Sequence, residues 1–183
     1  EANGVWLVLG AKATGLGPAG AGLVIEERDG SAQTIAADKI LVAIGRRPNV
    51  EGYGLDDLGL DRDGRFVQVD ARCATSMHNV WAVGDLTGEP MLAHRAMAQG
   101  RVVAEVIAGQ KSAFDPAGIP AVCFSNPEIV AIGRLPDTGG ESRLLTGTFP
   151  LVGNGRAMTL GADSGMVRVV ADPDTRAIVG MQA

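Results

Sequence analysis

An apolar segment that stops abruptly at Gly-Asp, just ahead of a helix, most constrains the fold of this chain. The segment is residues 80–83, the dipeptide is Gly84-Asp85, and Pro90 opens a stretch with helical spacing. This pattern predicts a strand, a short loop and a helix over residues 90–108. The small and apolar residues of the predicted helix share one face, namely Ala93, Ala96, Met97, Gly100, Val103, Ala104 and Ile107.

The position of Asp85 indicates a ligand site, because ligands of open α/β sheets bind beyond the carboxyl ends of strands. An ionised carboxylate accepts hydrogen bonds, which suits a ribose or ribityl hydroxyl. The N–H groups and the positive dipole end of the following helix favour an anion or an electron-rich carbonyl. A polyhydroxylated cofactor with an electron-accepting ring, such as a flavin, suits both the Asp85 carboxylate and the start of the helix. The alternative is that Asp85 only caps a turn.

Composition narrows the class of protein. The chain has 183 residues, of which 46% are hydrophobic and 20% charged, as in a folded globular protein. The formal net charge of −5, without a Lys/Arg-rich run, argues against a nucleic-acid partner. No apolar stretch approaches the roughly 18 residues that span a membrane. Cys73 and Cys123 match no metal or C-x-x-C pattern, so we expect two unpaired thiols in a reducing, cytoplasmic compartment.

The chain divides near Ile119, where the composition shifts. Before this point we expect short strands at residues 4–9, 23–27, 39–44, 66–69 and 80–83. After it, four more apolar segments predict strands, the last a pair around an Asp-Pro-Asp turn. The chain starts without Met and stops within an expected hairpin, so we expect both ends to be cuts through a larger protein.

Five ordered motifs carry a family resemblance: "ADKILVAIGRRPN", "TSMHNVWAVGD", "EPMLAHRAMAQGRVVAEVIAG", "PAVCFSNPEIVAIG" and "FPLVGNGRA". Together they resemble the dihydrolipoamide dehydrogenases, which belong to the flavin-dependent pyridine-nucleotide–disulfide oxidoreductases. The segment "MLAHRAMAQG" is most similar to the dihydrolipoamide dehydrogenases that serve branched-chain 2-oxoacid dehydrogenase complexes. Enzymes of this kind oxidise dihydrolipoyl groups and pass the electrons through a redox disulfide and FAD to NAD+.

The resemblance implies a fold that combines α/β and α+β parts. Residues 1–49 would be the C-terminal part of an NAD-binding domain. Residues 50–118 would belong to the FAD-binding and central region, β-rich with a parallel sheet. Residues 119–183 would be the N-terminal part of an α+β dimerisation domain, which implies a homodimer. The lipoyl domain of a 2-oxoacid dehydrogenase complex would be the other protein partner.

The resemblance also assigns cofactor-binding residues. Asp85 would hold the ribityl chain of FAD, and the residues at the helix start would line the flavin, mainly through backbone groups; these are Met91, Leu92, Ala93 and His94. Gly45 would let the NAD backbone approach closely because it lacks a Cβ. Ala13 would approach the NAD adenosine through its own backbone. His94 is expected to pack beside the flavin rather than to act as a base.

No catalytic residue and no metal ligand is assigned to this chain. The family's C-x-x-x-x-C redox pair is absent, and Cys73 and Cys123 are too far apart in sequence to replace it. The resemblance places both G-x-G-x-x-G cofactor loops, and the His-Glu pair that acts as base, outside these residues. The chain by itself is therefore expected to lack dehydrogenase activity.

Two other functions stay open from the sequence. The chain could belong to another FAD-dependent disulfide or NADH oxidoreductase of the same superfamily. It could also be a non-catalytic dimerisation module, a possibility that dimerisation without cofactor would favour.

Overall fold

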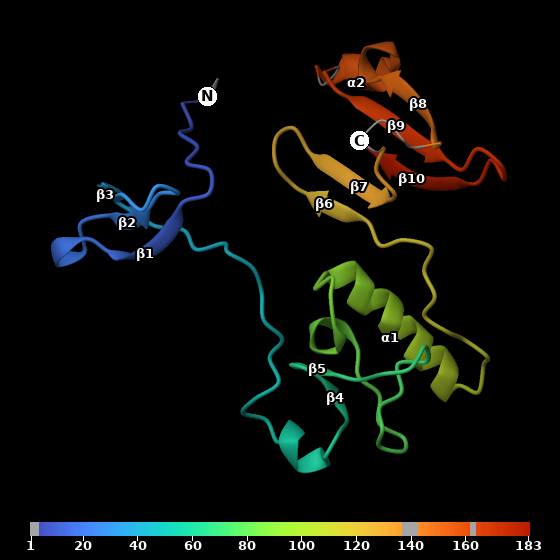
Figure 1. Ribbon diagram of the computed structural model, residues 1–183. Helices are drawn as coiled ribbons and strands as arrows, with labels where there is room; N and C mark the ends of the chain where they lie inside the picture. Colours follow the sequence, from blue (N-terminus) through green and yellow to red (C-terminus); the bar gives the residue numbers. More distant parts are fainter. Residues whose placement is uncertain (1–3, 137–142, 162–163) are drawn as a thin grey trace. The chain divides into compact units, whose positions relative to one another are not determined.

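The chain contains two compact units, residues Glu1–Arg46 and Arg47–Ala183. The structure is a computed structural model, and it describes residues 4–136, 143–161 and 164–183 (Figure 1). In these residues no helix is long and apolar enough to cross a membrane. Among the described residues, the first unit contains one sheet and the second unit contains two.

The first unit contains a three-stranded antiparallel sheet. Its strands are β1 (Lys12–Leu16), β2 (Leu23–Glu26) and β3 (Ala32–Ile35), with the short 3-10 helix η1 (Pro18–Gly20) between the first two. The Asp29-Gly30 turn joins β2 to β3, as the sequence predicts. The Asp29 carboxylate accepts from the Ser31 N–H at 2.9 Å, and Gly30 takes a φ of +82° that favours glycine.

Two expected strands of this unit are not formed. Residues 4–9 and 39–44 have extended or irregular backbone without strand pairing. Leu41 and Ile44 are 91% and 92% exposed. A strand needs the backbone N–H and C=O groups of a neighbour, and no described segment supplies them here. Residues 4–9 and 39–44 are apolar, but the prediction that they form strands is wrong.

The second unit begins with short elements around a small core. They are η2 (Leu55–Leu58), β4 (Arg62–Asp63), β5 (Phe66–Val67) and η3 (Gly84–Thr87). Leu55, Val67 and Ala82 form the buried centre of this region. The expected strand at residues 80–83 is wrong, because only one isolated bridge, Ala74 to Trp81, forms there.

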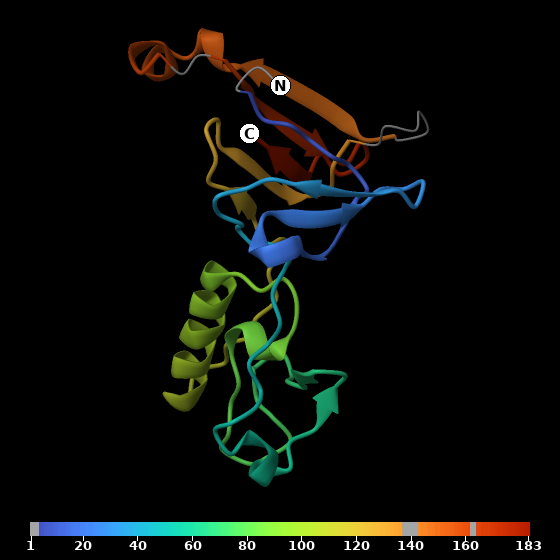
Figure 2. The same ribbon diagram turned by 90° about the vertical axis from the view of Figure 1, so that its left-hand side faces the viewer.

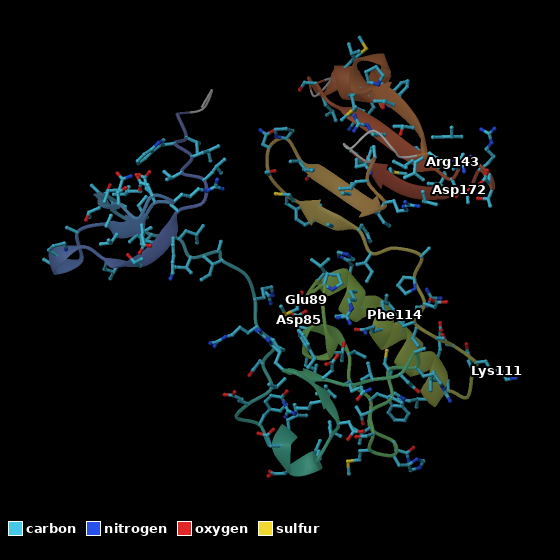
Figure 3. The ribbon with its side chains drawn as sticks, viewed as in Figure 1. Asp85, Glu89, Lys111, Phe114, Arg143 and Asp172 are labelled. Carbon is cyan, nitrogen blue, oxygen red and sulfur yellow. The ribbon has the colours of Figure 1, made fainter. Side chains whose placement is uncertain are left out.

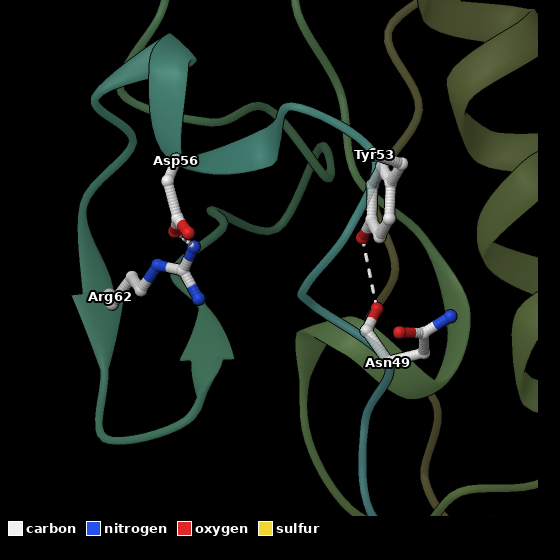
Figure 4. Close-up of polar contacts among 4 residues, drawn as sticks. All are labelled: Asn49, Tyr53, Asp56 and Arg62. Atoms are coloured by element: carbon white, nitrogen blue, oxygen red, sulfur yellow. Dashed lines mark hydrogen bonds and ion pairs between the residues drawn. The ribbon is translucent and has the colours of Figure 1, made fainter.

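Polar contacts close the loops beside this core (Figure 4). The Tyr53 hydroxyl donates to the Asn49 carbonyl oxygen at 2.9 Å. The Arg62 guanidinium pairs with the Asp56 carboxylate and ties β4 to η2. These contacts are largely exposed, so they contribute less to stability than the apolar cluster.

Helix α1 spans Ala93–Ile107 and begins three residues later than predicted. Its buried residues are Arg95, Gln99, Val102 and Val106. The apolar face that the sequence indicates is therefore not the most buried face of the helix: Met97 is 75% exposed, whereas the polar Gln99 is buried. Apolar spacing misplaced this face because two polar side chains are buried against the preceding turn, where they find hydrogen-bond partners.

A five-stranded antiparallel sheet follows, in the order β6-β7-β10-β9-β8. Its strands are β6 (Ala121–Cys123), β7 (Ile129–Gly133), β8 (Leu145–Pro150), β9 (Met166–Ala171) and β10 (Ile178–Gln182). The strand β8 leads into η4 (Leu151–Gly153) and helix α2 (Gly155–Thr159) at one end of the sheet (Figure 2). The predicted β9–β10 turn is confirmed, since Asp172 Oδ1 accepts from the N–H groups of Asp174 and Thr175.

The fold is mixed α/β and α+β, as expected, but one feature differs. All the strand pairs that the structure describes are antiparallel. The parallel sheet expected within residues 50–118 is therefore wrong for the described part of the chain. Parallel neighbours need a long crossover connection, whereas β4 and β5 there are joined by a tight turn and pair as a hairpin.

Candidate functional site

The site is built around a turn of residues 84–88, called here the Asp85 turn, and the start of helix α1. Gly84 takes a φ of +81° and Gly88 a φ of +130°, so the backbone reverses sharply on both sides of Asp85. Asp85 is half-buried in η3. Asp85 and Glu89 lie beside the N-terminal end of α1 (Figure 3).

The start of α1 carries N–H groups without a side-chain cap. Leu92 is the N-cap residue, and its side chain makes no capping bond. The first bond to its carbonyl comes from the Ala96 N–H at 3.2 Å. The earlier N–H groups of a helix have no partner within the helix itself, and the helix dipole adds partial positive charge there, so this end suits a ligand oxygen.

Two buried polar side chains fasten the Asp85 turn to the helix. Arg95 Nη1 donates to the Gly88 carbonyl at 2.8 Å and to the Gly84 carbonyl at 3.3 Å, and Nη2 donates to Thr87 Oγ1 at 3.2 Å. Gln99 Oε1 accepts from the Gly84 N–H at 2.8 Å. Gln99 Nε2 also lies 3.4 Å from Thr87 Oγ1. Arg95 and Gln99 thus hold both ends of the turn.

Sequence reasoning missed Arg95 and Gln99 as parts of this site. The available signal was their spacing, since residues four apart lie on the same face of a helix. Two polar residues on one face of a helix can be buried when a preceding Gly-Asp turn offers its backbone N–H and C=O groups as hydrogen-bond partners. Apolar periodicity alone could not find it.

The structure gathers five of the predicted cofactor residues at one place: Asp85, Met91, Leu92, Ala93 and His94. Met91 and Leu92 are half-buried, whereas Ala93 and His94 are exposed. The His94 ring nitrogen Nε2 lies 2.8 Å from the Pro120 carbonyl oxygen. This contact connects the first turn of α1 with the beginning of residues 119–183.

The other two predicted residues lie in the first unit. Ala13 is in β1, opposite Ile25 of β2. Gly45 has a φ of +127°, and a Cβ built there would meet no atom within 4 Å. Its backbone conformation, rather than crowding by this chain, therefore favours glycine at this position.

A literal G-x-G-x-x-G occurs at residues 15–20, apart from the two cofactor loops that the family resemblance places outside this chain. A dinucleotide-binding loop of this kind follows a strand and opens a helix of a βαβ unit. Here the pattern joins the antiparallel strands β1 and β2 through the three-residue η1. The structural context therefore assigns these glycines to a hairpin connection rather than to a phosphate-binding loop.

Cys73 is buried near the site, and both cysteines are free thiols. Burial raises the pKa of the Cys73 thiol, and the nearby Asp70 carboxylate raises it further, while Arg95 acts in the opposite direction. The thiol therefore stays protonated and is a poor nucleophile at neutral pH.

The two cysteines should differ in reactivity and in their effect on pH stability. Exposed Cys123 should react with Ellman's reagent in the folded chain, and Cys73 only on unfolding.

The raised pKa of Cys73 contributes stability below the thiol's unfolded pKa of about 8.5, and this contribution is lost as pH rises toward the folded pKa. Urea unfolding measures the free energy of unfolding, which should fall less steeply from neutral to alkaline pH in Cys73→Ala than in the wild type. Cys123→Ala, the control, should keep the wild-type slope, and equal slopes for all three would contradict the prediction.

Comparison with known proteins identifies the family. Residues 1–100 match the family described as pyridine nucleotide-disulphide oxidoreductase. Residues 119–183 match the dimerisation domain of the same family. The chain belongs to the pyridine nucleotide-disulphide oxidoreductases. The family resemblance carried by the five ordered motifs is thereby confirmed.

Relatives within this family share much of the sequence. The chain is 54% identical over 182 residues to a dihydrolipoyl dehydrogenase of Pseudomonas aeruginosa, covering 98% of this chain and 39% of that protein. It is 38% identical over 184 residues to a dihydrolipoyl dehydrogenase of Geobacillus stearothermophilus, covering 98% and 39% respectively. The chain thus spans about two fifths of the length of these curated relatives.

Two solved structures have a similar fold over most of this chain. The crystal structure of LpdA from Mycobacterium tuberculosis matches with a TM-score of 0.76 and 29% identity, over 94% of this chain and 38% of that chain. The flavoprotein disulfide reductase RclA of Escherichia coli, as its Cu(II) complex, matches with a TM-score of 0.75 and 23% identity, over 89% and 38%. The second likeness concerns the fold alone.

Proposed function

We propose that this chain is part of a dihydrolipoyl dehydrogenase, an oxidoreductase that oxidises protein-bound dihydrolipoamide to lipoamide. In this reaction electrons pass through a disulfide and FAD to NAD+. The observation that carries the proposal is the 54% identity to the P. aeruginosa dihydrolipoyl dehydrogenase over 182 residues. The Asp85 turn and the uncapped start of α1 lie within that matched region and have the chemistry that a flavin requires.

The described residues would form one side of an FAD site. Asp85, half-buried at the turn, would accept a hydrogen bond from a ribityl hydroxyl. The N–H groups at the start of α1 would face the pyrimidine side of the ring and favour the negative charge that reduction builds there. FAD, when bound, supplies the electron transfer between the disulfide and NAD+. The protein groups of this wall orient the cofactor and tune its electron affinity.

The remaining assignments are proposed on the same basis. Residues 1–49 would end an NAD-binding domain, with Ala13 and Gly45 beside the dinucleotide. Residues 50–118 would belong to the FAD-binding and central region. Residues 119–183 would begin the dimerisation domain of a homodimer. The lipoyl domain of a 2-oxoacid dehydrogenase complex is the proposed protein substrate, and the cytoplasm is the proposed location.

The reactive groups of this reaction are not assigned to the 183 residues. The sequence holds no C-x-x-x-x-C pair, and the buried, protonated Cys73 is unsuited to disulfide exchange. The chain alone is therefore expected to show no dihydrolipoamide oxidation with NAD+. Its proposed contribution is to bind and orient the cofactors.

A hybrid protein tests the proposal directly. Residues 1–183 would replace the aligned segment of the P. aeruginosa relative, and the purified hybrid would be compared with the isolated chain by mass and visible absorbance. We expect a flavin band and NAD+-dependent dihydrolipoamide oxidation in the hybrid, and neither in the isolated chain. A folded hybrid without flavin would refute the FAD site. A flavin-containing hybrid that oxidises only other thiols would favour a different disulfide oxidoreductase.

A further inference from the structure

Arg95 carries a buried charge that has no role in the function proposed above. Its residue is 8% exposed, and that of Gln99 is 2% exposed. A buried guanidinium is tolerated only when acceptors replace the water that it loses. Here the acceptors are the carbonyls of Gly84 and Gly88 and the hydroxyl of Thr87, all from the Asp85 turn.

The shape of the guanidinium matches the shape of the turn. Its planar fork of donors reaches acceptors on both sides of Asp85, which a single ammonium group cannot do as well. Gln99 adds an acceptor for the Gly84 N–H one helical turn further along. The turn also packs closely on the helix, because a Cβ built at Gly84 would lie 3.1 Å from Ala96 Cβ.

We propose that Arg95 and Gln99 are positioning residues of the cofactor site. They fix the Asp85 carboxylate relative to the uncapped start of α1, so that both walls face one ligand in a set geometry. The cofactor part of this inference rests on the proposed function. The mechanical part, that these side chains hold the turn, does not.

Amide hydrogen exchange of the 183-residue chain tests the mechanical part. Arg95→Met removes the donors without changing the bond from the Gly84 N–H to Gln99, so faster exchange at Gly84 reports loosening of the whole turn. We expect an increase of about tenfold or more, the effect of losing hydrogen bonds from a charged group. Gln99→Met, which removes the acceptor itself, is the positive control. Arg101→Met is the matched control, because Arg101 is exposed on the same helix and pairs only with Glu105 in the described contacts.

Unchanged Gly84 exchange in Arg95→Met would overturn the inference, whatever the flavin results. Far-UV circular dichroism of each variant identifies any general loss of fold. If Arg95→Met unfolds, Gln99→Glu takes its place. That variant keeps an acceptor for Gly84 but loses the amide donor to Thr87 Oγ1. Faster exchange at Thr87 and Gly88 would then support the inference, and wild-type exchange there would overturn it.

Flavin affinity of the hybrid protein tests the cofactor part. Arg95→Met should weaken FAD binding about tenfold and alter the visible flavin spectrum, whereas Arg101→Met should do neither. In an Asp85→Ala background, Arg95→Met should weaken binding further by less than about twofold, because both changes act through one carboxylate. Fully additive losses would overturn the positioning role. A folded hybrid without FAD would refute the proposed flavin site while leaving the exchange result to decide whether the turn is held.

Discussion

Gly180→Ala is expected to destabilise the five-stranded sheet by about 3 kcal/mol, at the upper end of the usual cost of overpacking. Gly180 is buried in β10, the central strand of the sheet. A Cβ built there would overlap the Arg134 carbonyl oxygen and lie 2.8 Å from the Arg134 carbonyl carbon. Because these are backbone atoms, no side-chain rotation can relieve the overlap.

The surrounding pairing explains why this position cannot adjust easily. Gly180 faces Gly133 of β7 across the strand pair, and a register shift lies between Ile178 and Gly180 on the β9 side. The Arg134 N–H donates to the Val179 carbonyl at 2.8 Å, which holds the two chains together at this point. An alanine methyl group would have to break this bond or displace β10 from its neighbours.

Gly147→Ala is the matched control for this prediction. Gly147 lies in β8 at the edge of the same sheet, and a Cβ built there meets no atom within 4 Å. Its substitution should change the free energy of unfolding by less than about 0.5 kcal/mol. Urea unfolding followed by circular dichroism measures both variants. Equal midpoints for Gly180→Ala and the wild type would contradict the close backbone contact.

Asp85→Ala is expected to weaken FAD binding to the hybrid protein by about 10- to 100-fold. The change removes a charged acceptor from the turn, and a hydrogen bond to a charged group contributes about 1.5–3 kcal/mol. The turn backbone should survive, because Arg95 and Gln99 bind the main chain of Gly84 and Gly88. Titration of the flavin-free hybrid with FAD, followed by visible absorbance, measures the affinity.

Asp63→Ala provides the control for the lost charge. Asp63 is exposed in β4, and its removal changes the net charge by the same amount. FAD affinity should stay within about twofold of the wild-type value, since an exposed charge outside the site acts weakly through solvent. If Asp63→Ala and Asp85→Ala weakened binding equally, the effect would be one of overall charge, and the ribityl role of Asp85 would be refuted.

The sequence predicted those parts of the fold that local chemistry specifies. The Asp29-Gly30 and Asp172 turns formed as expected, because their side chains bond their own backbone a few residues on. The strands around them formed because each turn brings an apolar segment back against its neighbour. Residues 39–44 have the same apolar character but no such turn to supply a partner, so pattern alone could not decide their state.

The sequence indicated that Asp85 lies close to the start of the helix, but not how the turn between them is held. The Gly-Asp dipeptide and the following helix indicated where Asp85 and the helix start would meet. The buried face of α1 was not predicted, because apolar spacing gives no reason to bury Arg95 and Gln99. Only the three-dimensional arrangement shows that the backbone groups of the turn are their partners. Polar residues that bury against a main chain leave little trace in a hydrophobic pattern.

The division of the chain into two units has a consequence for optical measurements. The sequence contains two tryptophans, and the boundary after Arg46 places Trp6 in one unit and Trp81 in the other. Trp6 is exposed and Trp81 is half-buried, so the two indoles have different surroundings in the folded chain and should differ in fluorescence emission. A variant that keeps only one indole would report on one unit alone. The protein thus carries a separate intrinsic fluorophore for each unit and needs no added label.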